Sequence, residues 1–492
     1  MKANQLLDNI EVLNNIDLIS LNIEIKGITD SSININNGDL FVAIAGNQMD
    51  GHDYIEDAIN KGAAAIVGEK EYIDLPVPYL QVPNTRKALG KIAKAYYNNK
   101  DDDKIIIGIT GTNGKTTTSY FLKNLIEKSK RTCGLIGTIE YIINGDCIKS
   151  VNTTPSALVL HKLLQESKDE VIIIEVSSHG LHQSRVEGIS FDVCIFTNLE
   201  QEHLDYHQTM DHYFQSKLLL FQHLKDNGVA IINGDNAWGR KAADLLQASG
   251  KTVYTVGQAS TCRFQINELD PICQTFQIID NGSSHQIHLP IPGIHNRYNA
   301  AFAFASGKCL GLDSTQLCEG FAEIKGVHGR FEKRLLPNGA MVIIDYAHTT
   351  AAIQSCLTTA KQHGAKRIIH IFGFRGNRDE RKRKDMLSIS ATESDYYILT
   401  MDDLNSVAAF DMLQTLDYLH ESYGNDNGIL IADRTMAIKW AIDLCMEGDW
   451  IIITGKGHEA YQQEYVLETK SDQETVDYLM DRQEKRKQVL TV

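Results

Sequence analysis

The sequence predicts an α/β protein of three domains, the second and third each built on a mostly parallel sheet. The chain has 492 residues, which is too long for one hydrophobic core. Short runs rich in Ile and Val recur without polar alternation, as is typical of parallel strands buried on both faces. Segments of helical pattern separate these runs, which indicates βαβ units. We therefore expect domains at residues 1–100, 101–326 and 327–492.

The first hundred residues predict a small α/β domain. The runs "DLFVAIAG" and "AAAIVGE" are expected to be strands, and "DGHDYIEDAINKGA" between them a helix. The charged segment "NNKDDDK", Asn98 to Lys104, is expected to link this domain to the next.

Two further series of strands predict the other two domains. The first series is "KIIIGIT", "EVIIIEVSS", "FDVCIFTN" and "GVAIIN". A boundary is expected near "GVHGRFEK", Gly326 to Lys333, because the alternation restarts after it. The second series is "MVIIDYAHT", "KRIIHIFGFRGNRD", "YYILTMDD" and "WIIITGKGHEA".

Composition limits the classes of partner. A net charge of -15 argues against a nucleic-acid-binding protein, which needs a basic face. No apolar run has the length required to cross a bilayer, and the N-terminus lacks the apolar core of a signal peptide. The nine cysteines form no C-x-x-C pair, which fits free thiols in a reducing compartment. We expect a cytoplasmic protein with no nucleic-acid or membrane partner.

The segment "GITGTNGKTTTSYF" predicts a phosphate site. Glycines between a strand and a helix let backbone N–H groups face an anion, and Lys115 adds a full positive charge. Thr116 offers a hydroxyl to Mg²⁺. The strict P-loop pattern has glycine where Ile109 stands, so this is a variant of the motif. The alternative is a tight strand–helix turn with a surface lysine.

Polar residues also follow other predicted strands, where open parallel sheets bind ligands. Glu175 ends one strand and is expected to hold magnesium, the alternative being a helix cap or a solvated acid. His203 and His207 follow another strand and are candidates to bind a second metal or to orient substrate. In the last domain, four strand ends carry polar clusters, which predict a binding crevice: Asp345, Tyr346 and His348; Arg375, Arg378 and Asp379; Asp402 and Asp403; Lys456, His458 and Glu459.

With these residues placed, the chain resembles the Mur ligases over nearly its whole length. The resemblance rests on "ITDSSININNGDLFVAIAG", "GTNGKTTT", "NTTP", "EVSSHGL", "FTNLEQEHLDYH", "GVHGRFE", "DYAHT" and "GKGHE", in family order. Within the family it is similar to the tripeptide synthetases (MurE type), which add the third residue of the peptidoglycan stem to UDP-N-acetylmuramoyl-dipeptide. The resemblance implies a uridine-nucleotide domain, a central P-loop ATPase-like domain and a Rossmann-like C-terminal domain.

The implied activity is ATP-dependent amide formation through an acyl phosphate, with ATP and Mg²⁺ required and the chain expected to act as a monomer. The positions that match the family's ATP contacts are Gly111, Thr112, Asn113, Gly114, Lys115, Thr116, Thr117, Asn296, Asn299, Arg330 and Asp345. Those that match its catalytic and metal residues are Lys115, Thr116, Glu175, His203 and Lys217. Lys217 matches a lysine that the family carbamylates, although by sequence alone it is an ordinary helix-surface lysine.

The positions that match contacts to the UDP-muramoyl peptide are Ser31, Thr153, Thr154, Ser177, Gln183 and Arg185. For Thr153 and Thr154 a helix-capping role before "PSALVLHKLL" is the alternative, and both roles can coexist. Because Arg330 and Asp345 reach ATP from the last domain, the resemblance also implies domain closure.

Two positions depart from the family pattern. The family usually has arginine where Ser32 stands, which removes one expected contact to the nucleotide. The family's amino-acid-selecting motif is Asp-Asn-Pro followed by arginine in diaminopimelate enzymes, and the matching residues here are Asp402, Asp403, Leu404 and Asn405.

A neutral amide at Asn405 cannot reproduce a bidentate charged contact to a distal carboxylate. We therefore expect L-lysine or ornithine before meso-diaminopimelate. The amino acid would be bound by Arg378, Asp402, Asp403, Asn405, Gly455 and Glu459. The alternatives are a paralogue that joins a different amino acid, another ligase such as folylpolyglutamate synthetase, a nucleotide-binding switch and a catalytically silent homologue.

Overall fold

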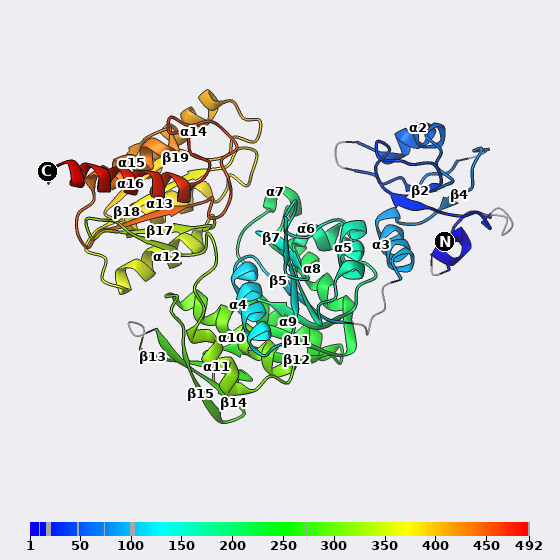
Figure 1. Cartoon of the computed structure of the whole chain (residues 1–492), viewed down its shortest axis with the longest axis horizontal. Coiled ribbons are helices and arrows are strands. Elements are labelled where there is room, and N and C mark those ends of the chain that lie inside the picture. The colour runs from blue at the N-terminus through cyan, green and yellow to red at the C-terminus, as the bar shows by residue number, and fades with distance from the viewer. Residues whose placement is uncertain are drawn as a thin grey trace.

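The computed structural model describes residues 1–8, 10–15, 21–46, 49–72, 74–98, 104–270 and 274–490. Three sheets, each formed by its own stretch of chain, confirm the predicted α/β class with three domains (Figure 1). They draw their strands from residues 27–81, 105–288 and 332–454. The predicted linker at Asn98–Lys104 lies mostly outside the described residues, and the domain boundaries stay predictions.

The N-terminal sheet is parallel, in the order β1 (Gly27–Thr29), β2 (Asp39–Val42), β3 (Ala65–Gly68) and β4 (Tyr79–Gln81). The two predicted strands correspond to β2 and β3, and all four residues of each are buried. The predicted helix is a 3-10 turn, η1 (Gly51–Tyr54), that continues as α2 (Ile55–Asn60). Helices α1 (Ala3–Leu6) and α3 (Thr85–Tyr96) complete this domain in the described residues.

The central sheet contains the four predicted strands as parallel neighbours, in the order β9 (Val171–Glu175), β5 (Ile105–Thr110), β10 (Phe191–Phe196) and β11 (Leu224–Asn233). Strands that the sequence analysis did not single out extend it on both sides. On one side lie β6 (Cys133–Ile136), β7 (Glu140–Ile143) and β8 (Asp146–Lys149); on the other lie β12 (Thr252–Gly257), β13 (Phe264–Asp270), β14 (Thr275–Asp280) and β15 (Ser283–His288). Both outer ends are antiparallel.

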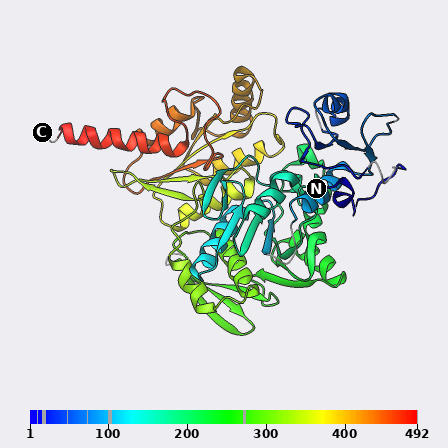
Figure 2. The same cartoon turned by 45° about the vertical axis from the view of Figure 1, so that its right-hand side comes forward.

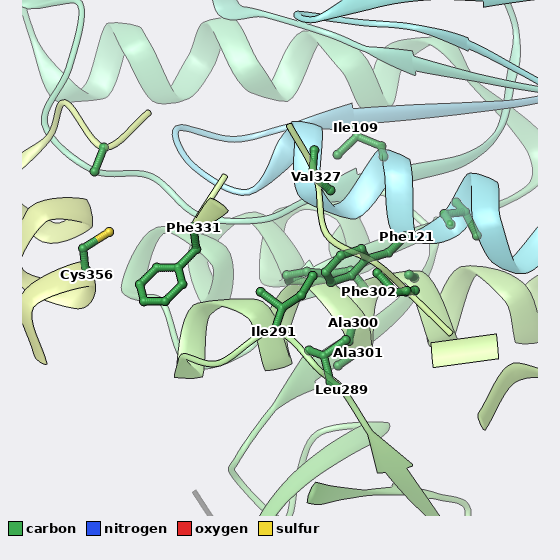
Figure 3. Close-up of a cluster of buried hydrophobic side chains, with 14 of the residues drawn as sticks. Ile109, Phe121, Leu289, Ile291, Ala300, Ala301, Phe302, Val327, Phe331 and Cys356 are labelled. Atoms are coloured by element: carbon green, nitrogen blue, oxygen red, sulfur yellow. The ribbon is translucent and has the colours of Figure 1, made fainter. Parts of the chain in front are cut away.

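Two helices of the central domain, α4 (Lys115–Lys128) and α10 (Ile294–Cys309), pack against each other beside the sheet. Figure 3 shows Phe121 of α4 among Ala300, Ala301 and Phe302 of α10. The other helices are α5 (Ala157–Glu166), α6 (Ser178–His182), α7 (Leu204–His207), α8 (Met210–Leu218), η2 (Leu219–His223), α9 (Ala237–Ala248) and α11 (Ser314–Ala322). The α4–α10 contact fixes the helix that begins at Lys115, and with it the preceding glycine loop.

The C-terminal sheet has the order β16 (Glu332–Leu335), β17 (Met341–Asp345), β21 (Trp450–Thr454), β18 (Ile368–Phe374), β19 (Tyr396–Met401) and β20 (Gly428–Leu430). All pairs are parallel except β16 with β17, so the four predicted strands end at one edge. Its helices are α12 (Thr350–Gln362), α13 (Arg383–Glu393), α14 (Ala409–Tyr423), α15 (Arg434–Leu444) and α16 (Asp472–Leu490), and α16 extends away from the domain in Figure 2.

Direct contacts join the central and C-terminal domains. Asn113 Nδ2 donates to Thr349 Oγ1 at 3.3 Å, and Arg330 Nη2 donates to Thr116 Oγ1 at 3.1 Å. The glycine loop therefore faces the edge of the C-terminal sheet at which its parallel strands end. Within the described part of the chain, no helix combines the length and the hydropathy that a membrane crossing requires.

Candidate active site

The loop between β5 and α4 requires its glycines. Gly111 and Gly114 have φ of +146° and +86°, which L-residues with a side chain rarely adopt. A Cβ at Gly111 would lie 1.9 Å from Thr197 Oγ1, and one at Gly114 would lie 2.4 Å from Asn299 Oδ1. The loop can therefore approach both neighbours only because these residues lack a side chain.

Lys115 lies at the start of α4 and bonds back to the loop. Its Nζ donates to the carbonyl oxygens of Gly111 and Thr112 at 2.8 and 2.9 Å. Burial lowers the pKa of this ammonium, which the charges of Glu175 and Glu202 oppose. The first N–H groups of a helix have no acceptor within the helix, so Lys115, Thr116 and Thr117 present a partial positive charge beside the ammonium.

The other amides of the loop are differently placed. The N–H groups of Thr112 and Asn113 donate to the backbone oxygen and to Oδ1 of Asn198, at 3.0 and 2.9 Å. The predicted role of these two amides in binding phosphate would require Asn198 to release them.

Glu175 is fully buried at the end of β9, which excludes a solvated acid. Its carboxylate accepts hydrogen bonds from the hydroxyl groups of Thr116 at 2.9 Å and Thr138 at 2.7 Å. A carboxylate and a hydroxyl in contact are hard oxygen donors, which Mg²⁺ prefers, and Mg²⁺ in such sites also takes water and phosphate oxygens. The pair fits the ion, although the described residues contain no group of three His, Cys, Asp or Glu side chains arranged to hold a metal.

The two histidines of the predicted pair are differently placed. His203 lines the cavity beside the glycine loop and has a left-handed backbone with φ of 57°. His207 is fully buried and bonds through Nε2 to Ser178 Oγ at 2.9 Å, so it is a core residue. Burial lowers the pKa of both rings, to about 4 for His203 and about 3 for His207, so both are neutral at pH 7.

Lys217 is not a surface residue, because its side chain is 1% exposed. Its Nζ donates to Gly111 O at 2.8 Å and lies 4.6 Å from the centre of the Tyr213 ring. Burial and the neighbouring Lys115 charge hold the pKa of this amine well below its usual range. A neutral amine is the form that reacts with CO₂, so the environment fits the carbamate implied by the family resemblance.

The cavity between the glycine loop and the C-terminal sheet has a volume of about 230 Å³. Six of its lining residues are Lys or Arg and four are Asp or Glu, so its charge favours anionic ligands. The predicted site residues that line it are Thr112, Asn113, Gly114, Lys115, Thr116, Thr117, Thr153, Ser177, His203, Arg330, Arg378 and Asp402. Four further residues of the predicted C-terminal crevice also line it: Tyr346, His348, Arg375 and Asp379.

A second cavity, of about 350 Å³, shares part of the glycine loop with the first. Its lining includes Asn296, Asn299 and Asp345. It also includes four predicted residues that line the first cavity: Asn113, Gly114, Thr117 and Arg330. Asn299 Oδ1 accepts from Thr118 Oγ1 at 3.3 Å, which ties the start of α10 to α4. The residues predicted to contact adenine, ribose and phosphate therefore meet around one loop.

Four of the residues predicted to bind the UDP-muramoyl peptide form one contact network: Thr154, Ser177, Gln183 and Arg185. Thr153 instead contacts Thr138 through its hydroxyl, and Ser31 lies in the N-terminal domain. Arg185 donates to Thr154 O at 2.6 Å and to Gln183 Oε1 at 2.8 Å, and Thr154 Oγ1 donates to Ser177 Oγ at 3.2 Å. The alternative capping role for Thr153 and Thr154 is wrong. The side chain of Ser156 caps α5 instead, accepting from Val159 N.

The acids predicted to bind the amino acid already have cationic partners. Asp402 lies 3.4 Å from Lys456 Nζ and 3.9 Å from Arg375 Nε, while Asp403 accepts from Lys456 and Glu459 from Arg375. Burial alone would raise the pKa of Asp402, but Arg375 and Lys456 hold it at about 2. An incoming ammonium would therefore have to share these acids.

Asn405 lies in a loop joined to the loop that follows β18. Its Nδ2 donates to Gly376 O at 3.0 Å, and its backbone oxygen accepts from Asn377 Nδ2 at 2.6 Å. A Cβ at Gly376 would lie 1.9 Å from Leu404 O, so glycine permits this contact. Gly455 has φ of +109° and its carbonyl accepts from Arg375 Nη2 at 3.2 Å.

Sequence reasoning missed Glu202, which is 5% exposed and lines the first cavity. It accepts from His348 Nε2 and lies 3.8 Å from Lys382 Nζ, and both partners belong to the C-terminal domain. Its position inside the motif "EQEHLDYH" was a signal, but the partners lie more than 140 residues away in the chain.

The comparisons with known proteins agree with this geometry. Three family models match: the Mur ligase family catalytic domain at residues 24–97, the Mur ligase middle domain at 109–307 and the Mur ligase glutamate ligase domain at 329–457. Among solved structures, a UDP-N-acetylmuramoyl-L-alanyl-D-glutamate–2,6-diaminopimelate ligase is 25% identical with a TM-score of 0.69, covering 98% of this chain and 99% of that one. The MurF ligase of Thermotoga maritima in complex with ADP shares the fold, with a TM-score of 0.62 and 18% identity over 89% and 95% of the two chains.

Two curated relatives, both UDP-N-acetylmuramoyl-L-alanyl-D-glutamate–2,6-diaminopimelate ligases, show the similarity over full length. The protein of Clostridium tetani is 35% identical, covering 94% of this chain and 95% of its own. The protein of Clostridium botulinum is 38% identical, covering 89% and 91%. The chain therefore belongs to the Mur ligase family of ATP-dependent acid–amino-acid ligases.

Proposed function

We propose that the protein adds a diamino acid to UDP-N-acetylmuramoyl-L-alanyl-D-glutamate as the third residue of a peptidoglycan precursor. The observation that carries this proposal is the convergence of the glycine loop, Thr116 and residues from three of the four C-terminal polar clusters on one cavity with more cationic than acidic residues, and Thr116 bonds to Glu175. The names of the curated relatives support the same nucleotide substrate.

The reaction joins two anions before it joins an amine. A carboxylate oxygen of the substrate attacks the γ-phosphorus of ATP, ADP leaves, and an acyl phosphate forms. The amine then attacks the acyl carbon, loses a proton, and inorganic phosphate leaves. Lys115, Arg330 and the start of α4 would neutralise the phosphoryl oxygens, which is the main requirement of such a transfer.

Thr116 and Glu175 would hold Mg²⁺, whose charge would compensate that of the phosphates. His203 and a carbamylated Lys217 are the proposed supports of a second ion. Thr153, Thr154, Ser177, Gln183, Arg185 and Ser31 would hold the nucleotide-linked peptide, with Arg185 as the partner of an anionic group.

Within this reaction we infer that the incoming amino acid lacks a distal carboxylate, as L-lysine and L-ornithine do. Asn405 carries no charge, and its Nδ2 is already bonded to Gly376 O. Arg378, which lines the cavity, would take the α-carboxylate. The second candidate is meso-diaminopimelate, which is favoured by the names of the relatives and by Lys382 and Arg383 in the cavity lining.

Phosphate release with UDP-muramoyl-dipeptide and a panel of amino acids tests both the proposed function and the inferred choice of amino acid. We expect release to require a diamino acid and to be faster with L-lysine or L-ornithine than with meso-diaminopimelate. The matched variant Asn405→Arg should shift the preference towards meso-diaminopimelate. A wild-type preference for diaminopimelate would overturn the inference on the amino acid. If none of the diamino acids supported phosphate release, the proposed function would be overturned.

A further inference from the structure

The ring of Tyr346 lies close to two guanidinium groups in the active site. Tyr346 directly follows β17 and lines both cavities. The Cζ atom of Arg330 lies 4.3 Å from the ring centre, and that of Arg375 lies 5.6 Å from it. A cation within about 6 Å of a ring centre is attracted by the ring's quadrupole, so both arginines are held by this tyrosine.

The two arginines lead to different ends of the site. Arg330 donates through Nη2 to Thr116 Oγ1 at 3.1 Å, and Thr116 in turn bonds to Glu175. Arg330 therefore reaches the proposed phosphate and magnesium end. Arg375 pairs with Glu459, donates to Gly455 O at 3.2 Å and lies 3.9 Å from Asp402. Arg375 therefore belongs to the proposed amino-acid end.

The hydroxyl of Tyr346 adds a second link to the amino-acid end. It donates to Glu459 Oε1 at 3.0 Å, while the other oxygen of Glu459 accepts from Arg375. Burial and the charge of Glu459 raise the pKa of this phenol to about 12, so the hydroxyl stays protonated and remains a donor at neutral pH.

The surroundings leave the ring little freedom. The rings of His348 and His458 lie 4.8 and 5.5 Å from it, and a Cβ at Gly457 would lie 2.8 Å from Tyr346 Cβ. In the part of the chain that the structure describes, the buried Nε atoms of Arg330 and Arg375 have no hydrogen-bond partner. The ring face is thus a principal contact that fixes where these two guanidinium groups lie.

We propose that Tyr346 is a positioning residue that couples the amino-acid end of the site to the phosphate end, because its ring holds both Arg375 and Arg330 and its hydroxyl holds Glu459. A substrate amine that rearranges Glu459 and Arg375 then changes the position of Arg330 at Thr116 through one rigid ring. This inference rests on the proposed function, because it assigns the two ends to the two substrates.

Two substitutions separate the parts of this role. Tyr346→Phe keeps the ring and removes the bond to Glu459, so the KM for the amino acid should rise about tenfold with kcat nearly unchanged. Tyr346→Leu also removes the ring, so the KM for ATP should rise and kcat should fall about tenfold. Tyr397→Phe is the control, because it removes a tyrosine hydroxyl in the same domain that bonds to His420 Nδ1 at 2.9 Å, away from both cavities.

The coupling itself is measured as the KM for ATP at low and at saturating amino acid. We expect the two values to differ in the wild type and in Tyr397→Phe, and to become equal in Tyr346→Leu. The proposal would be overturned if the KM for ATP depended on the amino-acid concentration equally in the wild type and in Tyr346→Leu. If Tyr346→Leu does not fold, Tyr346→Phe decides, since an unchanged KM for the amino acid would also overturn it. A wild type that ligates no diamino acid would instead refute the proposed function.

Discussion

Glu202 joins the central domain to the C-terminal domain, and removing its charge should weaken this contact between them. It is buried, accepts from His348 Nε2, and lies 3.7 Å from His203 Nε2 and 3.8 Å from Lys382 Nζ. Burial alone would raise its pKa, but His203, His348 and Lys382 hold the pKa well below its usual range. Glu202 is therefore an anion at neutral pH, and Glu202→Gln keeps its shape without the charge.

The expected magnitude follows from the negative charge that this substitution removes from a hydrogen bond and from an ion pair. A hydrogen bond to a charged group contributes about 1.5–3 kcal/mol, and the half-buried Lys382 would lose the anion that lies 3.8 Å from its Nζ as well. If catalysis requires the closed domains, kcat/KM should fall by roughly 10- to 100-fold. Steady-state ligation measures this change. Asp443→Asn is the control, because it breaks an exposed pair with Lys439 on α15 that should contribute little.

The Glu202→Gln variant should keep the wild-type fold, which its melting temperature checks. A variant Glu202→Gln that melts like the wild type and retains kcat/KM within about twofold would refute the claim that this carboxylate holds the domains together for catalysis.

Three further predictions concern buried charges. Asp402 has a pKa of about 2 in the folded protein against 3.8 in the unfolded chain, so it contributes stability above pH 3.8 that is lost as the pH falls through 2. Urea titrations of the wild type and Asp402→Asn measure this contribution. The difference between their unfolding free energies should shrink by about 2 kcal/mol over that pH range. Arg434 and Asp472 form a fully buried bidentate pair at 2.7 Å, and Asp472→Asn should cost about 3–5 kcal/mol of unfolding free energy by the same method. Lys217→Arg removes the amine that CO₂ would modify, so kcat should fall about 100-fold or more in the ligation assay; full activity would contradict the carbamate.

The parallel sheets and the glycine loop could be predicted because their signals are local. Runs such as "VIIIE" are apolar on both faces, and the observed β9 is buried at all five positions. Glycines, Lys115 and Thr116 are contiguous, so one turn of chain contains most of the phosphate chemistry. The antiparallel strand β14 was not predicted, because only every second residue in it is buried and the resulting sequence pattern is weaker.

The contacts between domains could not be predicted in the same way. The helix around Lys217 has an ordinary pattern, and nothing in it indicates that Tyr213 and the glycine loop cover the amine. Glu202 and His348 are far apart in sequence, and the contacts of Arg330 and Arg375 with the Tyr346 ring need three separate segments. The neutralisation of Asp402 and Asp403 by Lys456 is likewise a tertiary property.

The central claim is that the loop before α4, with Lys115, holds the phosphates of ATP while a substrate carboxylate is phosphorylated. The most direct measurement is the ADP-forming extension of UDP-muramoyl-dipeptide by the wild type, Lys115→Ala and Lys123→Ala. Lys123 is the matched control, because it lies on the same helix and pairs with Glu127 at 2.6 Å. The account predicts a loss of about 100-fold or more for Lys115→Ala and normal activity for Lys123→Ala; extension by Lys115→Ala at the wild-type rate would contradict it.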